Sequence, residues 1–281
     1  MTATTLVVGV GYLGQRFLEL NENTRGLTRR DVDLDSDAEW DISLPQRYNL
    51  IYTVPPSRDS VSDTRLERLL ANLNPAPQRF VYISTTGGYG DHGGALVYDA
   101  TPVDPRADSS ARRVAAEQAL HAWAARSGCT AIILRVPGIY GPGRLGIERI
   151  REQVPIVREA DVGPGNRIHV DDLAACCAAV LAETVPAGIY NVGDGDHRTS
   201  TWFTNEVARQ CGLPPPPTIS MAEAEQQFSP MRLSFLRDKR TVDTSKMRDV
   251  LGVEPSYANP VDGIHASIRE EGRRREASYR K

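Results

Sequence analysis

Short apolar runs alternate with longer amphipathic stretches over the first two thirds of the chain. Apolar residues recur at helical spacing in residues 62–73 and 109–126. The runs that we interpret as buried strands are residues 5–8, 50–54, 80–84 and 130–135. Strands that alternate with helices are typical of a parallel sheet wrapped by helices. We therefore predict an α/β fold with a doubly wound parallel sheet of the Rossmann type.

The pattern loosens after about residue 140. Here we expect one more strand at residues 188–192 and a stiff extended link at the prolines 214–217. The stretches that predict helices are 171–183, 201–211, 243–251 and 261–275. We predict a larger α/β domain at residues 1–165 and a smaller C-terminal α/β region at 166–281, with some segments that return to the first domain.

The charge balance narrows the classes of partner. The chain has 33 basic and 36 acidic residues, so it lacks the positive excess that drives sequence-independent binding of nucleic acid. No apolar run approaches the roughly 20 residues that span a bilayer. The first apolar stretch leads directly into a glycine-rich turn, which predicts a strand and no signal peptide. We expect a cytoplasmic protein that binds neither nucleic acid nor membrane.

Three residue types limit the chemistry. The four cysteines form no CxxC pair and the five histidines have no metal-ligand spacing, so no metal site is predicted. Only three lysines occur, Lys239, Lys246 and Lys281, and the first 238 residues contain none. Chemistry that depends on lysine is therefore excluded from these 238 residues.

A glycine-rich turn follows the first strand. Gly9, Gly11 and Gly14 form the spacing GxGxxG, and Tyr12 and Leu13 lie between the last two of them. The first glycine permits a tight turn, the second lets a diphosphate approach the backbone, and the third lets the helix pack on the strand. The N-terminus of that helix offers N–H groups to the phosphates. The pattern predicts dinucleotide binding.

The end of the second strand indicates which dinucleotide. A carboxylate usually stands there to bind the ribose 2′-hydroxyl, but the sequence has Arg29 and Arg30 instead. A guanidinium can bind a 2′-phosphate through paired charge-assisted hydrogen bonds. We therefore predict NADP as the cofactor, with NAD as the alternative.

Four segments that follow the turn in order carry a resemblance to a known family. They are WDIS at residues 40–43, YISTTGGYGD at 82–91, RVPGIYGPGR at 135–144 and RIHVDDLA at 167–174. With these segments the chain resembles the extended short-chain dehydrogenase/reductases, also called NAD-dependent epimerase/dehydratases. The resemblance runs from the first glycine of the turn to about residue 252.

The resemblance implies roles on the cofactor side. Asp41 would accept a hydrogen bond from the adenine amino group, and Ile42 would lie beside the ring. Val54, Pro55 and Pro56 would line the cofactor at the end of the family's fourth strand.

The resemblance also implies roles near the reacting atoms. Thr85 matches the family's active-site Ser or Thr, which polarises the substrate carbonyl or hydroxyl, and Pro137 and Gly138 would lie against the nicotinamide. For His169 we expect a structural hydrogen bond. Gly165 occupies the position where nucleotide-sugar enzymes commonly carry a phosphate-binding arginine, which argues against a nucleotide-sugar substrate.

The sequence departs from the family at the proton-transfer residues. Family enzymes use Tyr-xxx-Lys, in which the lysine lowers the pKa of the tyrosine. Counted back from Glu117, the lysine position holds Arg113 and the tyrosine position holds Ser109. A serine hydroxyl is too weak an acid to replace the phenol without an adjacent base.

Two other phenols could replace the missing one. Tyr140 has Arg144 four residues later, and Tyr89 follows Thr85 by four residues. We keep Thr85, Tyr89, Tyr140 and Arg113 as the candidate catalytic set, although packing in loops common to the family is the interpretation we favour for both tyrosines.

Two functions follow from these patterns. The first is an NADP-dependent oxidoreductase or epimerase that acts on an unidentified small molecule with altered acid–base residues. The alternative is a dinucleotide-binding sensor or scaffold that has lost turnover. The resemblance also implies a homodimer through the helices predicted at 62–73 and 109–126.

Overall fold

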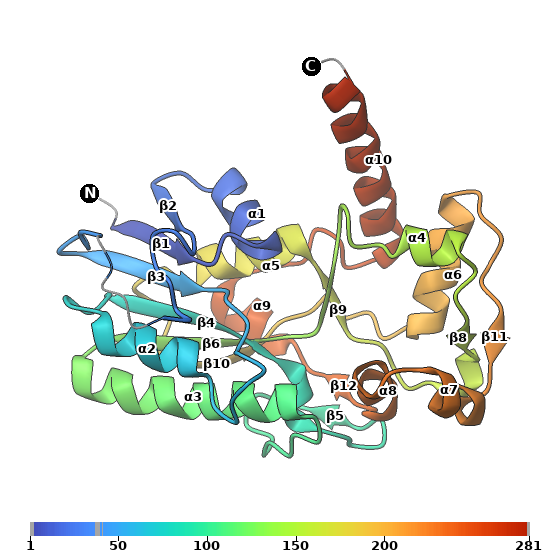
Figure 1. The fold of residues 1–281 in the computed structure, drawn as a ribbon, viewed down its shortest axis with the longest axis horizontal. Coiled ribbons are helices and arrows are strands. Elements are labelled where there is room, and N and C mark those ends of the chain that lie inside the picture. The colour runs from blue at the N-terminus through green and yellow to red at the C-terminus, as the bar shows by residue number, and fades with distance from the viewer. Residues whose placement is uncertain (1–2, 37–39, 41, 280–281) are drawn as a thin grey trace.

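The computed structural model describes residues 3–36, 40 and 42–279, and its centre is a parallel sheet of six strands (Figure 1). The strands in chain order are β1 (Thr4–Val8), β2 (Thr24–Leu27), β3 (Tyr48–Tyr52), β4 (Arg79–Thr85), β6 (Thr130–Val136) and β10 (Gly188–Asn191). Their order across the sheet is β10-β6-β4-β3-β1-β2. The predicted α/β fold is confirmed.

Helices cover both faces of this sheet. On one face α1 (Tyr12–Leu20), α5 (Val170–Ala179) and α9 (Ser245–Leu251) pack over an apolar core. On the other face α2 (Thr64–Asn72) and α3 (Asp108–Ser127) pack over a second core. Side chains from strand interiors enter both cores, because a strand in a parallel sheet is buried on its two faces.

The sheet ends at β2, which differs from the resemblance. A doubly wound dinucleotide-binding sheet usually continues with a third strand beside the second. Here the described residues between β2 and β3 form neither helix nor strand. The strand predicted at 50–54 is thus the third along the chain, although it lies beside β1, where the family's fourth strand lies. It also ends at Tyr52, so Val54 lies beyond it.

The other elements form a second body at the carboxyl ends of the strands (Figure 1). Its helices are α4 (Ile147–Arg151), α6 (Ser200–Gln210), α7 (Met221–Gln227), α8 (Pro230–Arg237) and α10 (Pro260–Tyr279). Short strands pair as β8 (Ile156–Val157) with β11 (Thr218–Ile219), β7 (Gly138–Tyr140) with β9 (Arg167–His169), and β5 (Leu96–Val97) with β12 (Thr241–Val242).

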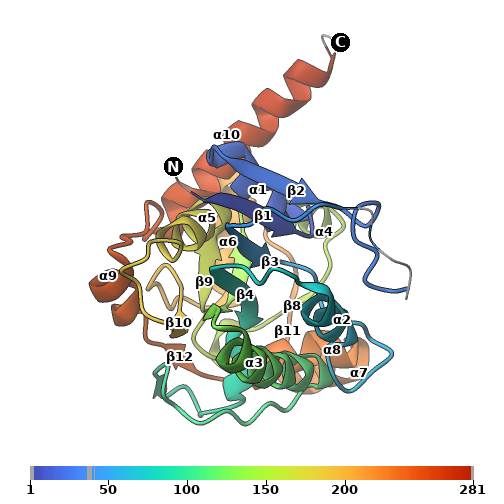
Figure 2. The same ribbon diagram turned by 90° about the vertical axis from the view of Figure 1, so that its left-hand side faces the viewer.

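The chain passes between the two bodies several times. Although α4 and β8 precede residue 166, they pack with later segments of the second body, whereas β10 and α9 return to the large sheet. The division at residue 165, with later segments that return to the first domain, stays a prediction. The last helix, α10, projects from the rest of the molecule (Figure 2).

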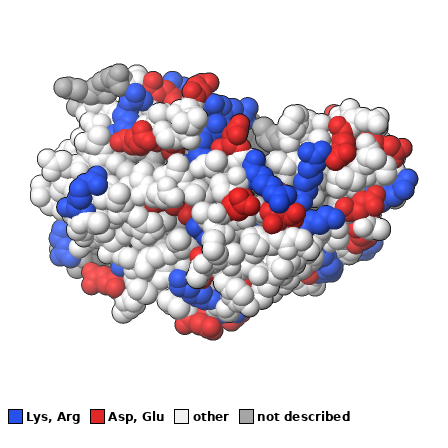
Figure 3. Space-filling view, turned by 90° about the horizontal axis from the view of Figure 1, so that it is seen from below, with Lys and Arg blue, Asp and Glu red and all other residues white. Residues whose placement is uncertain are grey.

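The surface shows mixed charge. On the face in Figure 3, Lys and Arg side chains lie among Asp and Glu side chains and do not gather in one basic patch. Among the described residues, no helix is long and apolar enough to cross a membrane.

Candidate functional site

The glycine turn joins β1 to α1, and packing explains two of its three glycines. Gly9 has φ +96°, and a Cβ there would lie 2.8 Å from Thr53 Oγ1. A Cβ on Gly14 would lie 2.2 Å from the carbonyl oxygen of Gly9. Both positions therefore require glycine, one for the turn and one for close contact between helix and turn.

Gly11 is different, because nothing in the chain requires it to be glycine. Its φ of −87° and ψ of −156° suit any residue, it is exposed, and no atom lies within 4 Å of the position that a Cβ would take. No side chain caps the N-terminus of α1 at Gly11, so the first N–H groups of the helix face open space. An uncapped helix start without a side chain fits a diphosphate that approaches the backbone.

A side chain beyond the turn adds positive charge at the same place. The guanidinium of Arg144 lies 4.1 Å from the centre of the Tyr12 ring, in the loop between β7 and α4. Tyr12 is half-buried, and Leu13 points into the core. The sequence pattern placed Tyr12 in the turn but gave no reason to pair it with Arg144, which is 132 positions away.

The end of β2 holds the two arginines of the predicted 2′-phosphate site. Arg29 is 73% exposed and lies 3.4 Å from Asp33 and 3.6 Å from Asp35. Arg30 is exposed, and in the described part of the chain it forms no ion pair. The carboxylate of Asp31 accepts hydrogen bonds from the Thr28 N–H and hydroxyl, at 2.8 and 2.7 Å. These bonds lower the pKa of Asp31 and turn its carboxylate back onto the loop.

The remaining cofactor residues lie along the same edge of the sheet. Ile42 and Val54 are half-buried and pack against the second core. The carbonyl of Pro55 accepts a hydrogen bond of 3.0 Å from Arg65, and Pro56 is half-buried beside it. Asp41 lies outside the described residues. Their contacts with adenine stay predictions.

Pro137 and Gly138 follow β6 at the same edge. Gly138 is exposed and Pro137 is half-buried, next to the loop after β10. Pro137 also lines a crevice too narrow for a water molecule, together with Arg167 and Asp194. This placement is compatible with the predicted contact between Pro137, Gly138 and a nicotinamide.

Thr85 ends β4 and begins a short 3-10 helix at Thr86–Tyr89. Its hydroxyl oxygen accepts the N–H of Gly87 at 3.1 Å, which leaves the hydroxyl proton for another acceptor. Ser110 approaches from the first turn of α3, because a Cβ on Gly87 would lie 2.5 Å from Ser110 Oγ and 3.3 Å from Thr85 Oγ1. The buried Ser110 is therefore the serine beside Thr85, whereas Ser109 is exposed.

Arg113 lies one turn further along α3. Its guanidinium donates a hydrogen bond to the carbonyl of Ile83, two residues before Thr85, and lies 5.8 Å from the centre of the Tyr82 ring. The structure thus places a fixed positive charge near the end of β4.

Tyr89 is fully buried and directed away from the surface. Its hydroxyl donates to Asn191 Oδ1 at 2.7 Å, and the Arg135 guanidinium lies 4.7 Å from the ring centre. Burial raises the pKa of the phenol. The geometry supports the packing interpretation and gives no support to a role in proton transfer.

Tyr140 is also buried, with 3% of its surface exposed. Its ring packs edge-on against His169 and Phe203, each with a centroid distance of 5.2 Å. Its hydroxyl faces α10, where a Cβ on Gly263 would lie 2.3 Å from it, and burial raises the pKa of the phenol. Tyr140 and Arg144 do not form the predicted pair, since Arg144 stacks on Tyr12 instead.

Beneath Thr85 lies a buried ion pair. Arg135 of β6 donates two hydrogen bonds to the carboxylate of Glu117 on α3, at 3.2 and 2.6 Å, and the Ser84 hydroxyl donates to the same carboxylate. The two charged side chains are 4% and 5% exposed. Glu117, which served above only as the reference for counting to Arg113 and Ser109, therefore fixes α3 to the strands that end at the site.

His169 has the structural role that we expected. Its Nδ1 accepts the N–H of Asp171, and its Nε2 lies 3.2 Å from Ser267 Oγ, whose proton goes to the Gly263 carbonyl. His169 must therefore donate through Nε2, so the ring is neutral and joins α5 to α10. Burial lowers its pKa to about 4, which keeps it neutral.

Packing explains why position 165 holds a glycine where nucleotide-sugar enzymes commonly carry an arginine. A Cβ on Gly165 would lie 2.3 Å from the guanidinium of Arg167. Arg167 itself pairs with Asp196 at 2.9 Å and donates to the Arg198 carbonyl. This guanidinium is bound within the protein and does not face a ligand.

One buried carboxyl, that of Asp194, was not predicted from the sequence. Asp194, 2% exposed, accepts the N–H of Asp196 at 2.9 Å through one oxygen, and its other oxygen has no hydrogen-bond partner among the described residues. Burial raises its pKa to about 7. Asp194 stands between two glycines directly after the strand predicted at 188–192, but this position does not show that its side chain is buried.

Comparison with known proteins finds a family match over part of the chain. Residues 62–193 match the model of the NAD dependent epimerase/dehydratase family. The match includes Thr85, Arg113, Glu117 and Pro137. Among the described residues, no group of three or more His, Cys, Asp or Glu side chains is arranged to hold a metal ion.

Three individual proteins show the extent of the likeness. Protein YeeZ of Escherichia coli is 27% identical over 244 residues, which cover 84% of this chain and 81% of YeeZ. The 3-diazoavenalumate denitrifying reductase of a Streptomyces species is 26% identical over 181 residues, or 62% of this chain and 57% of that protein. A solved structure of a conserved protein of unknown function from Silicibacter pomeroyi superposes with a TM-score of 0.81 at 28% identity, covering 96% of this chain and 99% of that one.

Replacement of Gly11 should affect dinucleotide binding, whereas replacement of Gly14 should affect stability. Replacement Gly11→Val should leave the melting temperature nearly unchanged, because the position is open and its backbone angles suit valine. It should weaken dinucleotide binding at least about tenfold by blocking approach to the helix N-terminus. Gly14→Ala is the control and should lower the melting temperature, since its Cβ meets the Gly9 carbonyl. A Gly11→Val protein that binds NADPH like the wild type would contradict the phosphate-binding role.

The raised pKa of Asp194 predicts that the free energy of unfolding depends on pH. The folded protein holds the proton up to a pKa of about 7, whereas the unfolded chain releases it near 4. The free energy of unfolding should therefore fall as the pH rises from about 4 to about 7, by at most roughly 4 kcal/mol from this group. Asp194→Asn should remove this part of the decline, measured by urea unfolding at several pH values.

The control is Asp196→Asn, because hydrogen bonds and charges from Arg198 lower the pKa of Asp196. Its replacement should instead reduce the stability at neutral pH. If wild type and Asp194→Asn lose stability in parallel between pH 4 and 7, the raised pKa of Asp194 is wrong.

Proposed function

We propose that this chain, which matches the NAD dependent epimerase/dehydratase family over residues 62–193, is an NADP-dependent oxidoreductase that acts on a small molecule. The observation that carries the proposal is Gly11, a glycine that neither packing nor backbone angles require, at an uncapped helix N-terminus. A bound dinucleotide explains both features, because its diphosphate needs a bare backbone and free N–H groups.

The preference for NADP rests on the end of β2. Two guanidiniums stand where an NAD-binding protein usually presents a carboxylate. Arg29 is shared with Asp33 and Asp35, which leaves Arg30 as the stronger candidate for the 2′-phosphate. The carboxylate nearest the strand, Asp31, accepts both hydrogen bonds from Thr28 through one oxygen, Oδ2, and is turned toward its own loop.

The reacting end of the cofactor would lie between Thr85 and Pro137. A bound reduced nicotinamide supplies a hydride to the substrate. Thr85 can donate its hydroxyl proton as a hydrogen bond to the substrate oxygen or nitrogen, because its own acceptor is already used by Gly87. Arg113 adds positive charge at the end of β4, where negative charge would develop on the reduced group.

Proton transfer sets this chain apart from a Tyr-xxx-Lys enzyme. The hydroxyls of Tyr89 and Tyr140 are buried, so no phenol of the candidate set faces the substrate. We therefore propose reduction of an electrophile that accepts hydride without a phenolic acid, with the balancing proton taken from water. The name of the Streptomyces relative, a denitrifying reductase, supports a reductase over an epimerase.

The second candidate is a dinucleotide sensor without turnover. It is favoured by the same burial of both phenols, since a protein that only binds the cofactor needs no proton donor. The two candidates agree on cofactor binding and differ only in consumption of NADPH.

The first test is a titration of the purified chain with NADPH and with NADH, followed by nicotinamide fluorescence. NADPH should bind about tenfold or more tightly, because only it carries the 2′-phosphate. Arg30→Ser should remove that difference by weakening NADPH binding and leaving NADH binding unchanged. The control is Arg25→Ser, which replaces an exposed arginine within β2 itself.

Equal affinity for the two dinucleotides in the wild type would overturn the NADP preference. Absence of binding for both would overturn the proposed oxidoreductase and the sensor together. If NADPH binds, oxidation across a panel of carbonyl, imine and diazo compounds separates the two. Turnover that Thr85→Ala reduces supports the oxidoreductase, and binding without any oxidation supports the sensor.

A homodimer through α2 and α3 is part of the proposal. The two helices pack side by side on one face of the sheet, and the side of the molecule that carries α3 shows a broad uncharged area (Figure 3). Sedimentation equilibrium should give twice the mass of the chain. A single-chain mass at micromolar concentration would exclude a stable dimer.

A further inference from the structure

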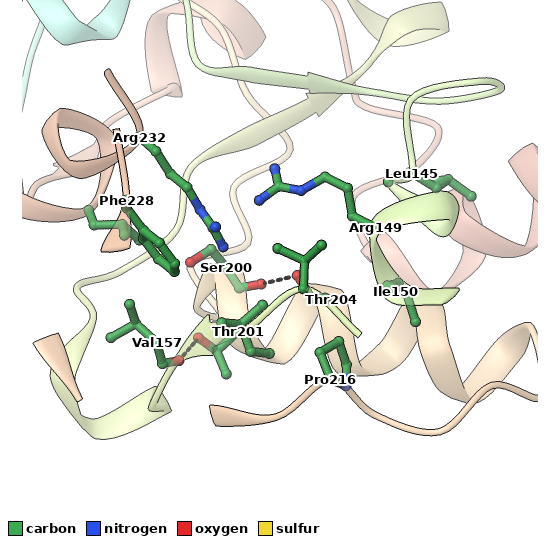
Figure 4. A pocket seen from close by; sticks show the side chains of 14 residues that line it. Leu145, Arg149, Ile150, Val157, Ser200, Thr201, Thr204, Pro216, Phe228 and Arg232 are labelled. Carbon is green, nitrogen blue, oxygen red and sulfur yellow. Dashed lines mark hydrogen bonds between the residues drawn. The ribbon is translucent and has the colours of Figure 1, made fainter. Parts of the chain in front are cut away.

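The second body contains a cavity of about 180 Å³ that none of the candidate site residues line. It lies between α4, the start of α6, the strand β8 and the segment that carries α7 and α8 (Figure 4). Most of its wall is apolar, from Leu145, Ile150, Val154, Ile156, Val157, Pro216, Phe228 and Leu236.

Two arginines from different elements point into this cavity. Arg149 comes from α4 and Arg232 from α8, and their guanidiniums point toward one another across it (Figure 4). Within the described residues, neither guanidinium has a carboxylate at ion-pair distance, whereas Arg151 of α4 and Arg237 of α8 pair with Glu148 and Glu225. Two like charges thus meet beside an apolar wall without an internal counter-ion.

Arg232 is held in place although its charge is unbalanced. One of its nitrogens donates to the Pro155 carbonyl at 2.7 Å, and its guanidinium lies 3.3 Å from the centre of the Phe228 ring. Burial and the nearby charge of Arg149 lower its pKa to about 10. An anion between the two guanidiniums would relieve both the lost hydration and the repulsion.

The start of α6 contributes polar groups to the same wall. Ser200, Thr201 and Thr204 line the cavity from the first turn of the helix, whose N-terminal end carries partial positive charge. The Thr201 and Thr204 hydroxyls donate to the carbonyls of Val157 and Ser200, so their protons are already used within the protein. The exposed Ser200 hydroxyl is left as a donor beside the arginines.

From this arrangement we infer that the cavity binds the anionic group, a carboxylate or a phosphate, of a small substrate with an apolar body. The guanidiniums of Arg149 and Arg232 would hold the anionic oxygens, and the aliphatic wall and Phe228 would contact the body. The volume is below the roughly 300 Å³ at which pockets for drug-sized ligands begin, so the cavity suits a compact acid. The inference rests on the proposed function, because it assigns the substrate class of that enzyme.

The test uses the full-length protein without dinucleotide, so that it does not depend on cofactor binding. Isothermal titration is carried out with benzoate, with inorganic phosphate and with the uncharged analogue benzamide, all at one ionic strength. Benzoate or phosphate should bind and raise the melting temperature, and benzamide should not. Binding of benzoate alone identifies a carboxylate site, and binding of phosphate alone identifies a phosphate site.

Matched variants connect the binding to the two arginines. Arg149→Met and Arg232→Met should each weaken anion binding at least about tenfold. Arg151→Met on α4 and Arg237→Met on α8 are the controls, because these arginines pair with Glu148 and Glu225 on the surface. Arg232→Lys keeps the charge and serves if loss of the contact with Phe228 prevents Arg232→Met from folding.

Two results would overturn the inference: no binding of either anion to the wild type, or unchanged binding in Arg149→Met. NADPH titration of the same variants separates this failure from failure of the proposed function. An anion site lost in Arg149→Met with NADPH binding intact supports a substrate site apart from the cofactor. A wild type that binds the anion but no dinucleotide leaves the anion site standing and overturns the oxidoreductase.

Discussion

The site depends on one buried pair of opposite charges, Glu117 on α3 and Arg135 on β6. A charge removed from water is costly unless a partner compensates it, so each of these side chains fixes the position of the other. The Ser84 hydroxyl donates to the same carboxylate, and the Tyr89 ring lies against the same guanidinium. The strand end that carries Thr85, the 3-10 helix after it and the start of α3 are thereby held in one arrangement.

Six arginines of the chain fall into two kinds according to their partners. Arg16, Arg135 and Arg167 have carboxylates beside them and serve the architecture. Arg30 at the end of β2 and Arg149 and Arg232 in the second body have none among the described residues. Structural charges are usually balanced within a protein, so unbalanced guanidiniums at an edge or in a cavity are the ones that a ligand would complete. Among the unpaired arginines, Arg30 lies at the sheet and Arg149 and Arg232 lie in the second body. Such a separation is expected for a protein that brings a dinucleotide and a second molecule together.

Sequence patterns predicted the elements that repeat a strong period and missed those set by distant contacts. The strands at 80–84 and 130–135 and the helix at 109–126 appeared within one or two residues of their predicted ends, because long buried runs and regular apolar spacing are local signals. α7 and α8 were not predicted, although Ser220 with Glu223 forms a capping box and Pro230 follows the N-cap Ser229. The arrangement of Arg149 with Arg232 could not be predicted, since 83 positions separate them and only the folded second body brings them to one cavity. Burial of the Tyr89 and Tyr140 hydroxyls depends in the same way on Asn191 and α10.

The place of β10 in the sheet has a consequence for the order in which the chain folds. β10 pairs with β6, yet the segment between them includes α4, β8, β9 and α5. A ribosome must therefore release about two thirds of the protein before β10 can pair with β6. Until then the edge of β6 that β10 will cover stays unpaired. The chain passes into the second body before β10 and again after it, so several crossings of the chain join that body to the sheet. A chain cut between them would not separate into a stable dinucleotide-binding half and a remainder.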